Sequence, residues 1–239
     1  MNAWDRNAQR RRDQITSGID LSYNHVLTPT ILQHLPAADG ESCKRLLDAG
    51  CGPGILAARL RSAGWAVTGV DESKTMIEIA RADHGDSDGL LFLVAMFDQL
   101  PKVFPADTFD AVVCNMSLTG IADPATSLQG VRAVLRPGGA LVLTDVHPWF
   151  WRVYKGHEEV TYWEPQTLIE PFTISLDPEP LPAQIVVAYR PLEKLCDAIV
   201  DAGFAITRLV EPRPDSDVEK QYPAPWRYPR FILVAAEAR

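Results

Sequence analysis

Short apolar runs alternate with amphipathic stretches along most of the chain, and this rhythm is typical of a parallel sheet wrapped by helices. The runs predict buried strands over residues 45–49, 66–70, 90–94, 109–114, 140–146, 205–211 and 231–236. Between them, apolar residues at helical spacing predict helices over residues 55–63, 72–82, 124–135 and 192–202. The pattern therefore predicts a doubly wound, mostly parallel α/β fold.

The alternation stops after residue 146 and returns at residue 189. The stretch between is rich in Pro, Trp, Tyr and Glu, and an irregular segment of this length usually has a function. We interpret residues 147–188 as an insertion or lid, with a hairpin around residues 160–163 and a strand near residues 185–188. The expected parts of the single domain 1–239 are a helical cap (1–42), the first half of the sheet (43–146), the insertion (147–188) and the rest of the sheet (189–239).

Composition places the chain among ordinary globular proteins, with 46% hydrophobic and 23% charged residues in 239. A net charge of −8 argues against nucleic acid as the main partner. The run Arg10-Arg11-Arg12 is interpreted as an exposed helical turn, with an RNA or anionic-substrate contact as the alternative. Scattered cysteines, a polar N-terminus and no apolar run of about 20 residues predict a cytoplasmic protein with no membrane partner, as a monomer or homodimer.

A glycine-rich turn, Gly50-Cys51-Gly52-Pro53-Gly54, directly follows the first predicted strand. Its glycines permit a tight bend close to a ligand, and the helix after it offers free N–H groups. A dinucleotide-binding turn reads G-x-G-x-x-G, whereas Ile55 occupies the sixth position here. Because Asp48 precedes the turn, a pyrophosphate would be repelled. The turn therefore favours a ligand that carries a cationic amine.

Asp71 ends the second predicted strand, seventeen residues after Gly54. A carboxylate at that strand end can accept hydrogen bonds from both hydroxyls of a ribose. The alternative is an N-cap for the helix that follows. Taken together with the glycine turn, Asp71 is interpreted as a ribose ligand.

Four motifs in register resemble those of the class I S-adenosylmethionine-dependent methyltransferases. They are Leu46-Leu47-Asp48-Ala49-Gly50-Cys51-Gly52-Pro53-Gly54, Val67-Thr68-Gly69-Val70-Asp71-Glu72-Ser73, Phe109-Asp110-Ala111-Val112-Val113 and Val134-Leu135-Arg136-Pro137-Gly138-Gly139. The resemblance covers residues 45–146, and beyond them a softer match points to a bacterial subgroup that acts on small molecules. It implies S-adenosylmethionine as the cofactor and a Rossmann-like seven-stranded sheet whose last strand is antiparallel.

The resemblance also implies cofactor-binding roles for residues at the strand ends. Those implied to hold the methionine moiety and the ribose are Asp48, Gly50, Cys51, Gly52 and Asp71. Those implied to pack beside the adenine or to close over the cofactor are Glu72, Met76 and Tyr23, the last with packing between cap and core as its alternative. Those implied to lie beneath the sulfonium are Asn115 and Met116.

The chain departs from the family pattern after the third strand. Many members carry an acidic residue there that contacts the adenine amine, but the corresponding residues here are Met96 and Phe97. These two are expected to supply packing alone, unless Asp98 reaches the amine.

Methyl transfer from a sulfonium needs mainly alignment of donor and acceptor, and a base is required only when the acceptor must lose a proton. His147 follows the fifth strand, at the edge where open α/β sheets bind ligands, and histidine titrates near neutral pH. We interpret His147 as the candidate base of an O-methylation. A structural histidine that hydrogen-bonds a loop carbonyl is the alternative.

Candidates for contact with the acceptor are the cap histidine and the aromatic side chains of the insertion, namely His25, Trp149, Trp151 and Tyr162. The aromatic residues form either a wall against a planar acceptor or the insertion's own small core. No grouping of His, Cys, Asp and Glu has metal-ligand spacing, so no metal is expected.

Two rival functions stay open, and a third is disfavoured. The acceptor atom could be nitrogen or carbon instead of oxygen, and the chain could be a binding protein that keeps the cofactor without turnover. A nicotinamide-dependent oxidoreductase is disfavoured because the sixth-position glycine is absent.

Overall fold

The computed structural model describes residues 2–38 and 44–239. Its main sheet has the strand order β3-β2-β1-β4-β5-β9-β8. The strands are β1 (Arg45–Ala49), β2 (Ala66–Asp71), β3 (Leu90–Val94), β4 (Phe109–Asn115), β5 (Leu135–Val146), β8 (Phe204–Val210) and β9 (Phe231–Ala238). Strands β1 to β5 are parallel, and β9 runs antiparallel to both of its neighbours. The predicted seven-stranded sheet with an antiparallel last strand is confirmed.

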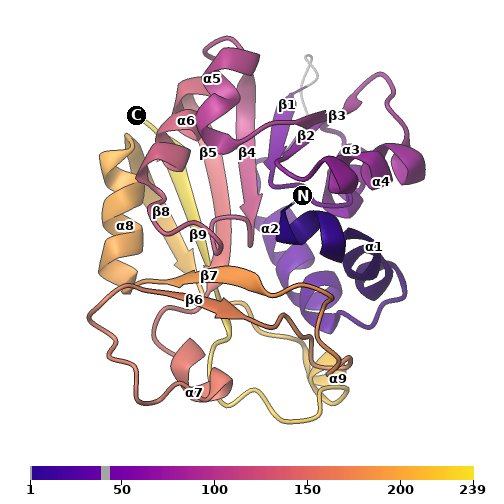
Figure 1. The fold of residues 1–239 in the computed structure, drawn as a ribbon. Helices are drawn as coiled ribbons and strands as arrows, with labels where there is room; N and C mark the ends of the chain where they lie inside the picture. Colours follow the sequence, from indigo (N-terminus) through magenta and orange to yellow (C-terminus); the bar gives the residue numbers. More distant parts are fainter. Residues whose placement is uncertain (1, 39–43) are drawn as a thin grey trace.

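Helices cover both faces of this sheet (Figure 1). They are α1 (Ala3–Thr16), η1 (Ser22–Leu27), α2 (Thr28–His34), α3 (Ile55–Ser62), α4 (Lys74–His84), η2 (Phe97–Gln99), α5 (Leu100–Val103), α6 (Ala125–Val134), α7 (Trp151–Lys155), α8 (Leu192–Asp201) and α9 (Ser216–Glu219). Successive residues of β1 point to opposite faces: Leu46 packs with the cap helices, α3 and α4, and Leu47 packs with α5, α6 and α8. Burial on both faces explains the near-continuous apolar runs.

The start of β5 differs from the sequence prediction. Helix α6 ends at Val134, and β5 begins at Leu135 rather than at residue 140. Leu135 pairs with Phe109 and Ala140 pairs with Ala111, so residues 136–139 loop out between the two pairs. Residues 136–139, which lie between the predicted helix and the predicted strand, therefore form a bulge within β5.

The N-terminal cap lies against α4 and over the carboxyl edge of the sheet (Figure 1). Helix α1 begins with a capping box between Asn2 and Asp5, and Asp5 also accepts a 2.7 Å hydrogen bond from Ser73, the N-cap of α4. Helix α2 begins at Thr28, inside the predicted helical cap. The predicted boundary between cap and sheet, at residues 42–43, and with it Cys43, lie outside the described residues.

The insertion contains α7 and a two-stranded sheet of β6 (Gln166–Glu170) and β7 (Ile185–Tyr189). The strand predicted near residues 185–188 is confirmed, but the hairpin predicted around residues 160–163 is wrong. Residues 160–163 form bends, and β7 pairs instead with β6, whose alternation of half-buried and exposed residues is weak as a sequence signal.

Helix α1 packs against α4 and is hydrogen-bonded to the insertion. The side chain of Asn7 is fully buried, donates to the Ala183 carbonyl at 2.9 Å and accepts from the Ala183 N–H at 2.8 Å. Arg10 and Gln14 both bond to Asp177, each at 3.0 Å. These contacts hold the insertion beneath the carboxyl edge of the sheet, where Figure 1 shows β6 and β7 crossing the strand ends.

Candidate active site

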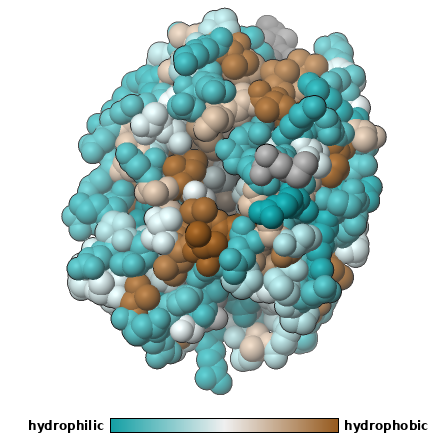
Figure 2. All heavy atoms as spheres, in the orientation of Figure 1, coloured by the Kyte–Doolittle hydropathy of each residue, from teal (hydrophilic) through white to brown (hydrophobic). Residues whose placement is uncertain are grey.

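A cavity of about 1230 Å³ opens at the carboxyl ends of β1, β2 and β4, where the strand order reverses. Open α/β sheets bind ligands at this switch point. Figure 2 shows a hollow near the middle of this face, bordered by apolar residues. The cap, the insertion and residues 224–231 complete the walls. The volume exceeds the roughly 300–1,000 Å³ of a pocket for one drug-sized ligand.

Every residue that the sequence assigns to the cofactor lines this cavity. They are Tyr23, Asp48, Gly50, Cys51, Gly52, Asp71, Glu72, Met76, Met96, Phe97, Asn115 and Met116. The structure thus brings together residues from the cap, three strand ends and the loop after β3.

The glycine turn requires glycine for two physical reasons. Gly50, Gly52 and Gly54 all have positive φ angles, between 53° and 79°, which residues with a side chain rarely adopt. A Cβ on Gly50 would lie 2.3 Å from the Cβ of Ser117, so the loops after β1 and β4 approach each other only because that side chain is missing.

The carboxylate of Asp48 is buried at the end of β1, and neither of its oxygens accepts a hydrogen bond from the described residues. Burial, followed by the nearby charge of Asp71, raises the pKa of Asp48 to about 7, with a small opposing effect from the backbone of Ala57. A buried carboxylate without a partner is costly unless a ligand supplies a donor. A cationic group fits at this position.

The carboxylate of Asp71 accepts backbone hydrogen bonds from Gly52 and Ser73, each at 2.9 Å. Burial raises the pKa of Asp71 to about 6, against the lowering effect of these two bonds. Asp71 therefore fastens the glycine turn to the end of β2. Each of its oxygens keeps a lone pair for a further donor, such as a ribose hydroxyl.

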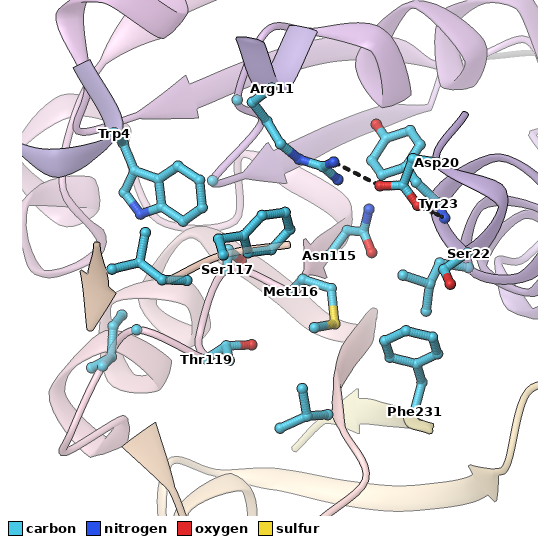
Figure 3. Close-up of a pocket in the computed structure, with 18 of the residues that line it drawn as sticks. Trp4, Arg11, Asp20, Ser22, Tyr23, Asn115, Met116, Ser117, Thr119 and Phe231 are labelled. Atoms are coloured by element: carbon cyan, nitrogen blue, oxygen red, sulfur yellow. Dashed lines mark hydrogen bonds and ion pairs between the residues drawn. The ribbon is translucent and has the colours of Figure 1, made fainter. Parts of the chain in front are cut away.

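The end of β4 places three polar or strained groups at the centre of the cavity (Figure 3). The Asn115 side-chain oxygen accepts a 2.8 Å hydrogen bond from Thr144, which leaves its amide group as a donor. Met116 has a φ of 57°, a left-handed conformation that is uncommon outside glycine. The buried hydroxyl of Ser117 has no hydrogen-bond partner among the described residues.

The hydroxyl of Thr119 is a polar group of the cavity that the sequence did not predict. Thr119 lines the cavity and donates a 2.7 Å hydrogen bond to the buried carboxylate of Asp145. Arg190 pairs with that carboxylate at 3.4 Å and also donates to the carbonyls of Leu118 and Ile121. Burial raises the pKa of Asp145, opposed by Arg190, Thr119 and its own strand's backbone. An apolar run around Asp145 conceals this network in the sequence.

The cap contributes a cation and a phenol to the same wall (Figure 3). Arg11 forms a 2.6 Å ion pair with Asp20, and its guanidinium lies 5.7 Å from the ring centre of Tyr23. Burial raises the pKa of Tyr23, so its hydroxyl keeps its proton. Arg11 belongs to the arginine run that we interpreted from the sequence as an exposed helical turn. That interpretation is wrong for Arg11, because its side chain is only 13% exposed.

His147 lies elsewhere than the sequence predicts. It is not among the described residues that line the cavity. One ring nitrogen lies 3.1 Å from Glu211, and the other accepts a hydrogen bond from the Trp149 N–H. Burial lowers the pKa of His147, against the raising effect of Glu211. The reason for the difference is that the His147 ring is held by Glu211, directly after β8, and by the Trp149 N–H, and these contacts direct it away from the cavity.

The four predicted acceptor contacts also lie outside the described lining, and each has another place. Trp151 stacks on Tyr189 at 3.4 Å in the insertion's own core. Trp149 packs edge-to-face on Tyr162, whose hydroxyl accepts from the Leu192 N–H at 2.9 Å. His25 is exposed on η1. For Trp151, the structure therefore matches the alternative interpretation, in which the aromatic residues form the insertion's own small core.

No cluster of three or more His, Cys, Asp and Glu with a metal-binding arrangement occurs within residues 2–38 and 44–239. Within the same ranges, no helix has the length and apolar character needed to span a bilayer.

A family model described as "Methyltransferase domain" matches residues 47–143, which include the second half of β1, the glycine turn, β2 to β4 and most of β5. This part of the chain is therefore similar to methyltransferase domains. The resemblance to class I methyltransferases drawn from the four motifs is thereby confirmed.

Several methyltransferases are similar in sequence to about half of this chain. A ubiquinone biosynthesis O-methyltransferase from Histophilus somni is 35% identical over 132 residues, which cover 53% of this chain and 55% of that protein. The chain thus matches about half the length of this relative.

Solved structures extend the likeness to the fold of nearly the whole chain. A methyltransferase from Listeria monocytogenes has a TM-score of 0.73 at 19% identity and covers 89% of this chain and 96% of its own. The 1,6-didemethyltoxoflavin-N1-methyltransferase of Burkholderia thailandensis, solved with its substrate and S-adenosylhomocysteine, has a TM-score of 0.60 at 16% identity and covers 97% of this chain and 86% of its own. At these identities the likeness concerns the fold alone.

Proposed function

We propose that the protein transfers the methyl group of S-adenosylmethionine to a hydroxyl of a small, largely apolar acceptor. The observation that carries this proposal is the buried carboxylate of Asp48, which lines the cavity and has no hydrogen-bond partner in the described part of the chain. The cationic amine of a methionine moiety satisfies such a carboxylate. A pyrophosphate does not, because it adds negative charge beside Asp48 and Asp71.

The remaining cofactor residues fit the other parts of the same molecule. The positive-φ turn at Gly50 and Gly52 brings backbone close to the ligand, and Asp71 is placed to accept from a ribose. Met76 and Phe97 offer apolar contact to an adenine. Met96, at the position where many members of the family carry an acidic residue, is 46% exposed at the rim.

S-adenosylmethionine brings a methyl group that is already activated by its sulfonium, so the protein's main task is to align the acceptor. The cavity beyond Asn115 and Met116 is lined largely by apolar side chains: Trp4, Ile15, Val146, Phe172, Ile174, Val186 and Phe231. This lining favours an acceptor with an apolar or aromatic body. The O-methyltransferase relatives, which match about half of the chain, support oxygen over nitrogen or carbon as the acceptor atom.

Thr119 and Asp145 provide a route for the acceptor's proton. The hydroxyl of Thr119 already donates to Asp145, so its oxygen is free to accept a hydrogen bond from an acceptor hydroxyl. As the acceptor oxygen takes the methyl group, its proton passes to the Thr119 oxygen and the Thr119 proton passes to Asp145. We assign the base role to this pair rather than to His147, whose ring nitrogens are engaged outside the cavity.

The decisive experiment measures binding and turnover separately. Titration calorimetry with S-adenosylhomocysteine tests the cofactor, and transfer of labelled methyl from S-adenosylmethionine to a panel of phenols, amines and activated carbon acids tests the acceptor class. We expect S-adenosylhomocysteine to bind and a phenol to be methylated fastest.

A matched pair of variants controls this experiment. Asp48→Asn should weaken S-adenosylhomocysteine, whereas Asp88→Asn, on an exposed loop outside the cavity, should not. Binding of NADH in place of S-adenosylhomocysteine would refute the proposal. Tight cofactor binding with no methyl transfer to the panel or to a cell extract would instead indicate a binding protein.

A further inference from the structure

The loop after β4, which carries Thr119, lies directly against strand β7 of the insertion. The Ala188 N–H donates a 2.6 Å hydrogen bond to the Thr119 carbonyl. A Cβ on Gly120 would lie 3.3 Å from the carbonyl oxygen of Val186, so the two backbones approach each other closely at this glycine. The position of the loop is therefore set by the insertion as well as by β4.

Arg190, the residue after β7, contacts the other side of the same loop. Its Nη2 donates to the Leu118 carbonyl at 3.4 Å and to the Ile121 carbonyl. Its Nη1 lies 3.4 Å from Oδ2 of Asp145, and the two side chains are only 5% and 4% exposed. One buried guanidinium thus connects both ends of the loop to a buried carboxylate.

This arrangement uses properties that distinguish arginine from lysine. A guanidinium presents five N–H donors in a rigid planar fork and stays protonated, whereas an ammonium is a compact point charge on a flexible stem. A lysine in place of Arg190 would supply the charge but not the three separate contacts to a carboxylate and two carbonyls.

Within the described part of the chain, Arg190 is the one charged side chain that acts on the pKa of Asp145. Burial raises this pKa, while Arg190, the Thr119 hydroxyl and the Val146 N–H lower it. The ionised form of Asp145 therefore depends on Arg190 for its charge partner.

Other groups next to Asp145 do not take this place. Its cross-strand partner on β9 is Ile232, which carries no charge. His147 lies two residues along the chain, but its ring nitrogens are engaged with Glu211 and with the Trp149 N–H.

We infer that Arg190 is a positioning residue for the proton transfer, which holds the Asp145 carboxylate against the Thr119 hydroxyl. By binding the carbonyls at both ends of the loop, it also keeps that hydroxyl directed into the cavity. This inference rests on the proposed function, because it concerns the base of the same site. The acceptor's proton passes to the Thr119 oxygen and the Thr119 proton passes to Asp145, and Arg190 keeps all of its own protons.

The test compares two acceptors of similar size that differ in their need for a base. At pH 8, 4-ethylphenol keeps its proton, whereas 4-nitrophenol is mostly ionised. The kcat for methylation of each is measured with the full-length protein and S-adenosylmethionine. A residue that positions the base affects 4-ethylphenol alone, because the nitrophenolate has no proton to lose. A residue that only supports the fold affects both acceptors.

Arg190→Gln removes the charge and the fork of donors. We expect its kcat with 4-ethylphenol to fall at least about tenfold, while its kcat with 4-nitrophenol and its affinity for S-adenosylhomocysteine stay near the wild-type values. Loss of the cation raises the pKa of Asp145 further, so the acid limb of the pH profile with 4-ethylphenol should move to higher pH, by roughly 1–3 pH units.

Arg190→Lys keeps the charge and serves as a second test if the Gln variant does not fold. We expect its acid limb to stay near the wild-type position and its kcat with 4-ethylphenol to fall severalfold, again without an effect on 4-nitrophenol. Arg132→Gln is the matched control. Arg132 also donates to two backbone carbonyls, those of Leu135 and Arg239, but it lies outside the described lining, so its loss should leave the ratio of the two kcat values unchanged.

A double variant shows whether Arg190 acts through Thr119. In the background of Thr119→Val, which lacks the hydroxyl, Arg190→Gln should cause little further loss of kcat with 4-ethylphenol. Two residues with independent roles would instead give losses that multiply.

Equal losses with both phenols, multiplied losses in the double variant, or an unmoved acid limb in folded Arg190→Gln would overturn the inference. Failure of the wild type to bind S-adenosylhomocysteine, or binding without methylation of either phenol, would overturn the proposed function instead. In that case a carbon-13 NMR titration of the Asp145 carboxyl still decides whether Arg190 holds it ionised. An identical pKa in the wild type and in the Arg190 variant would show that it does not.

Discussion

The hydroxyl of Thr119 donates a 2.7 Å hydrogen bond to the buried carboxylate of Asp145, and Arg190 pairs with the other oxygen of that carboxylate. This arrangement fixes the direction of the Thr119 proton and leaves the oxygen open toward the cavity (Figure 3). It also anchors the insertion, because the Thr119 carbonyl accepts a hydrogen bond from the Ala188 N–H.

Replacing Thr119 tests its role in taking the acceptor's proton. We expect Thr119→Val to lower kcat for a phenol by about 10²-fold or more, the usual size of a general acid–base contribution, and Thr119→Ser to retain most of it. The kcat of the wild type should fall as pH drops below the raised pKa of Asp145, since a protonated carboxyl no longer accepts the proton. Equal activity of the Val and Ser variants would contradict the role.

Replacing His147 tests the candidate base that the sequence offers. We expect His147→Ala to keep its affinity for S-adenosylhomocysteine and to lose less than about tenfold in turnover, because the ring contacts Glu211 and Trp149 outside the cavity. A loss of about 10²–10⁴-fold, with the protein still folded, would restore His147 as the base.

The binding of S-adenosylhomocysteine should depend on pH through Asp48. The ligand's ammonium group prefers the ionised carboxylate, whose pKa in the free protein is raised to about 7. Affinity should therefore increase from pH 5 to about pH 7 and level off above it. Asp48→Asn should weaken binding about tenfold to a hundredfold at pH 8 and flatten most of this dependence. A pH-independent affinity in the wild type would count against the assignment.

The same aspartate should destabilise the unliganded protein at neutral pH. The folded-state pKa of Asp48, about 7, lies above its unfolded value near 3.8, so the folded state binds more protons between these two values. Its contribution to stability is present below pH 4 and is lost as pH rises to about 7. Asp48→Asn, which stays neutral, should thus be more stable than the wild type at pH 8, by of the order of 1–4 kcal/mol, and similar to it near pH 4. Urea denaturation at both pH values measures this difference, and a less stable variant at pH 8 would contradict it.

The cofactor end of the site could be predicted because each of its residues belongs to a short local motif. Asp48 lies near the end of a strand that continues into Gly50, so the local sequence indicates both the charge and the bend. Asp71 ends the neighbouring strand. Parallel strands bring their carboxyl ends to one edge, so adjacency follows from the secondary structure alone.

The acceptor end could not be predicted in this way, because its wall is assembled from distant segments. Asn7 and Ala183, which hold the cap to the insertion, are 176 residues apart. Glu211, which holds the ring of His147, is 64 residues away from it. No local pattern links these residues, and their contacts depend on how the cap, the insertion and the β8–β9 connection pack.

The sequence by itself determined where the main strands lie, where the glycine turn lies and which carboxylates would receive the cofactor. These features could be predicted because backbone geometry and residue periodicity are properties of short segments. Only the tertiary structure decided which side chains face the acceptor. It turned His147 and the insertion's tryptophans away from the cavity and brought Thr119 to its wall. The physical reason is that side chains in irregular segments take their direction from packing between segments far apart in the sequence, not from the local conformational preference of each residue.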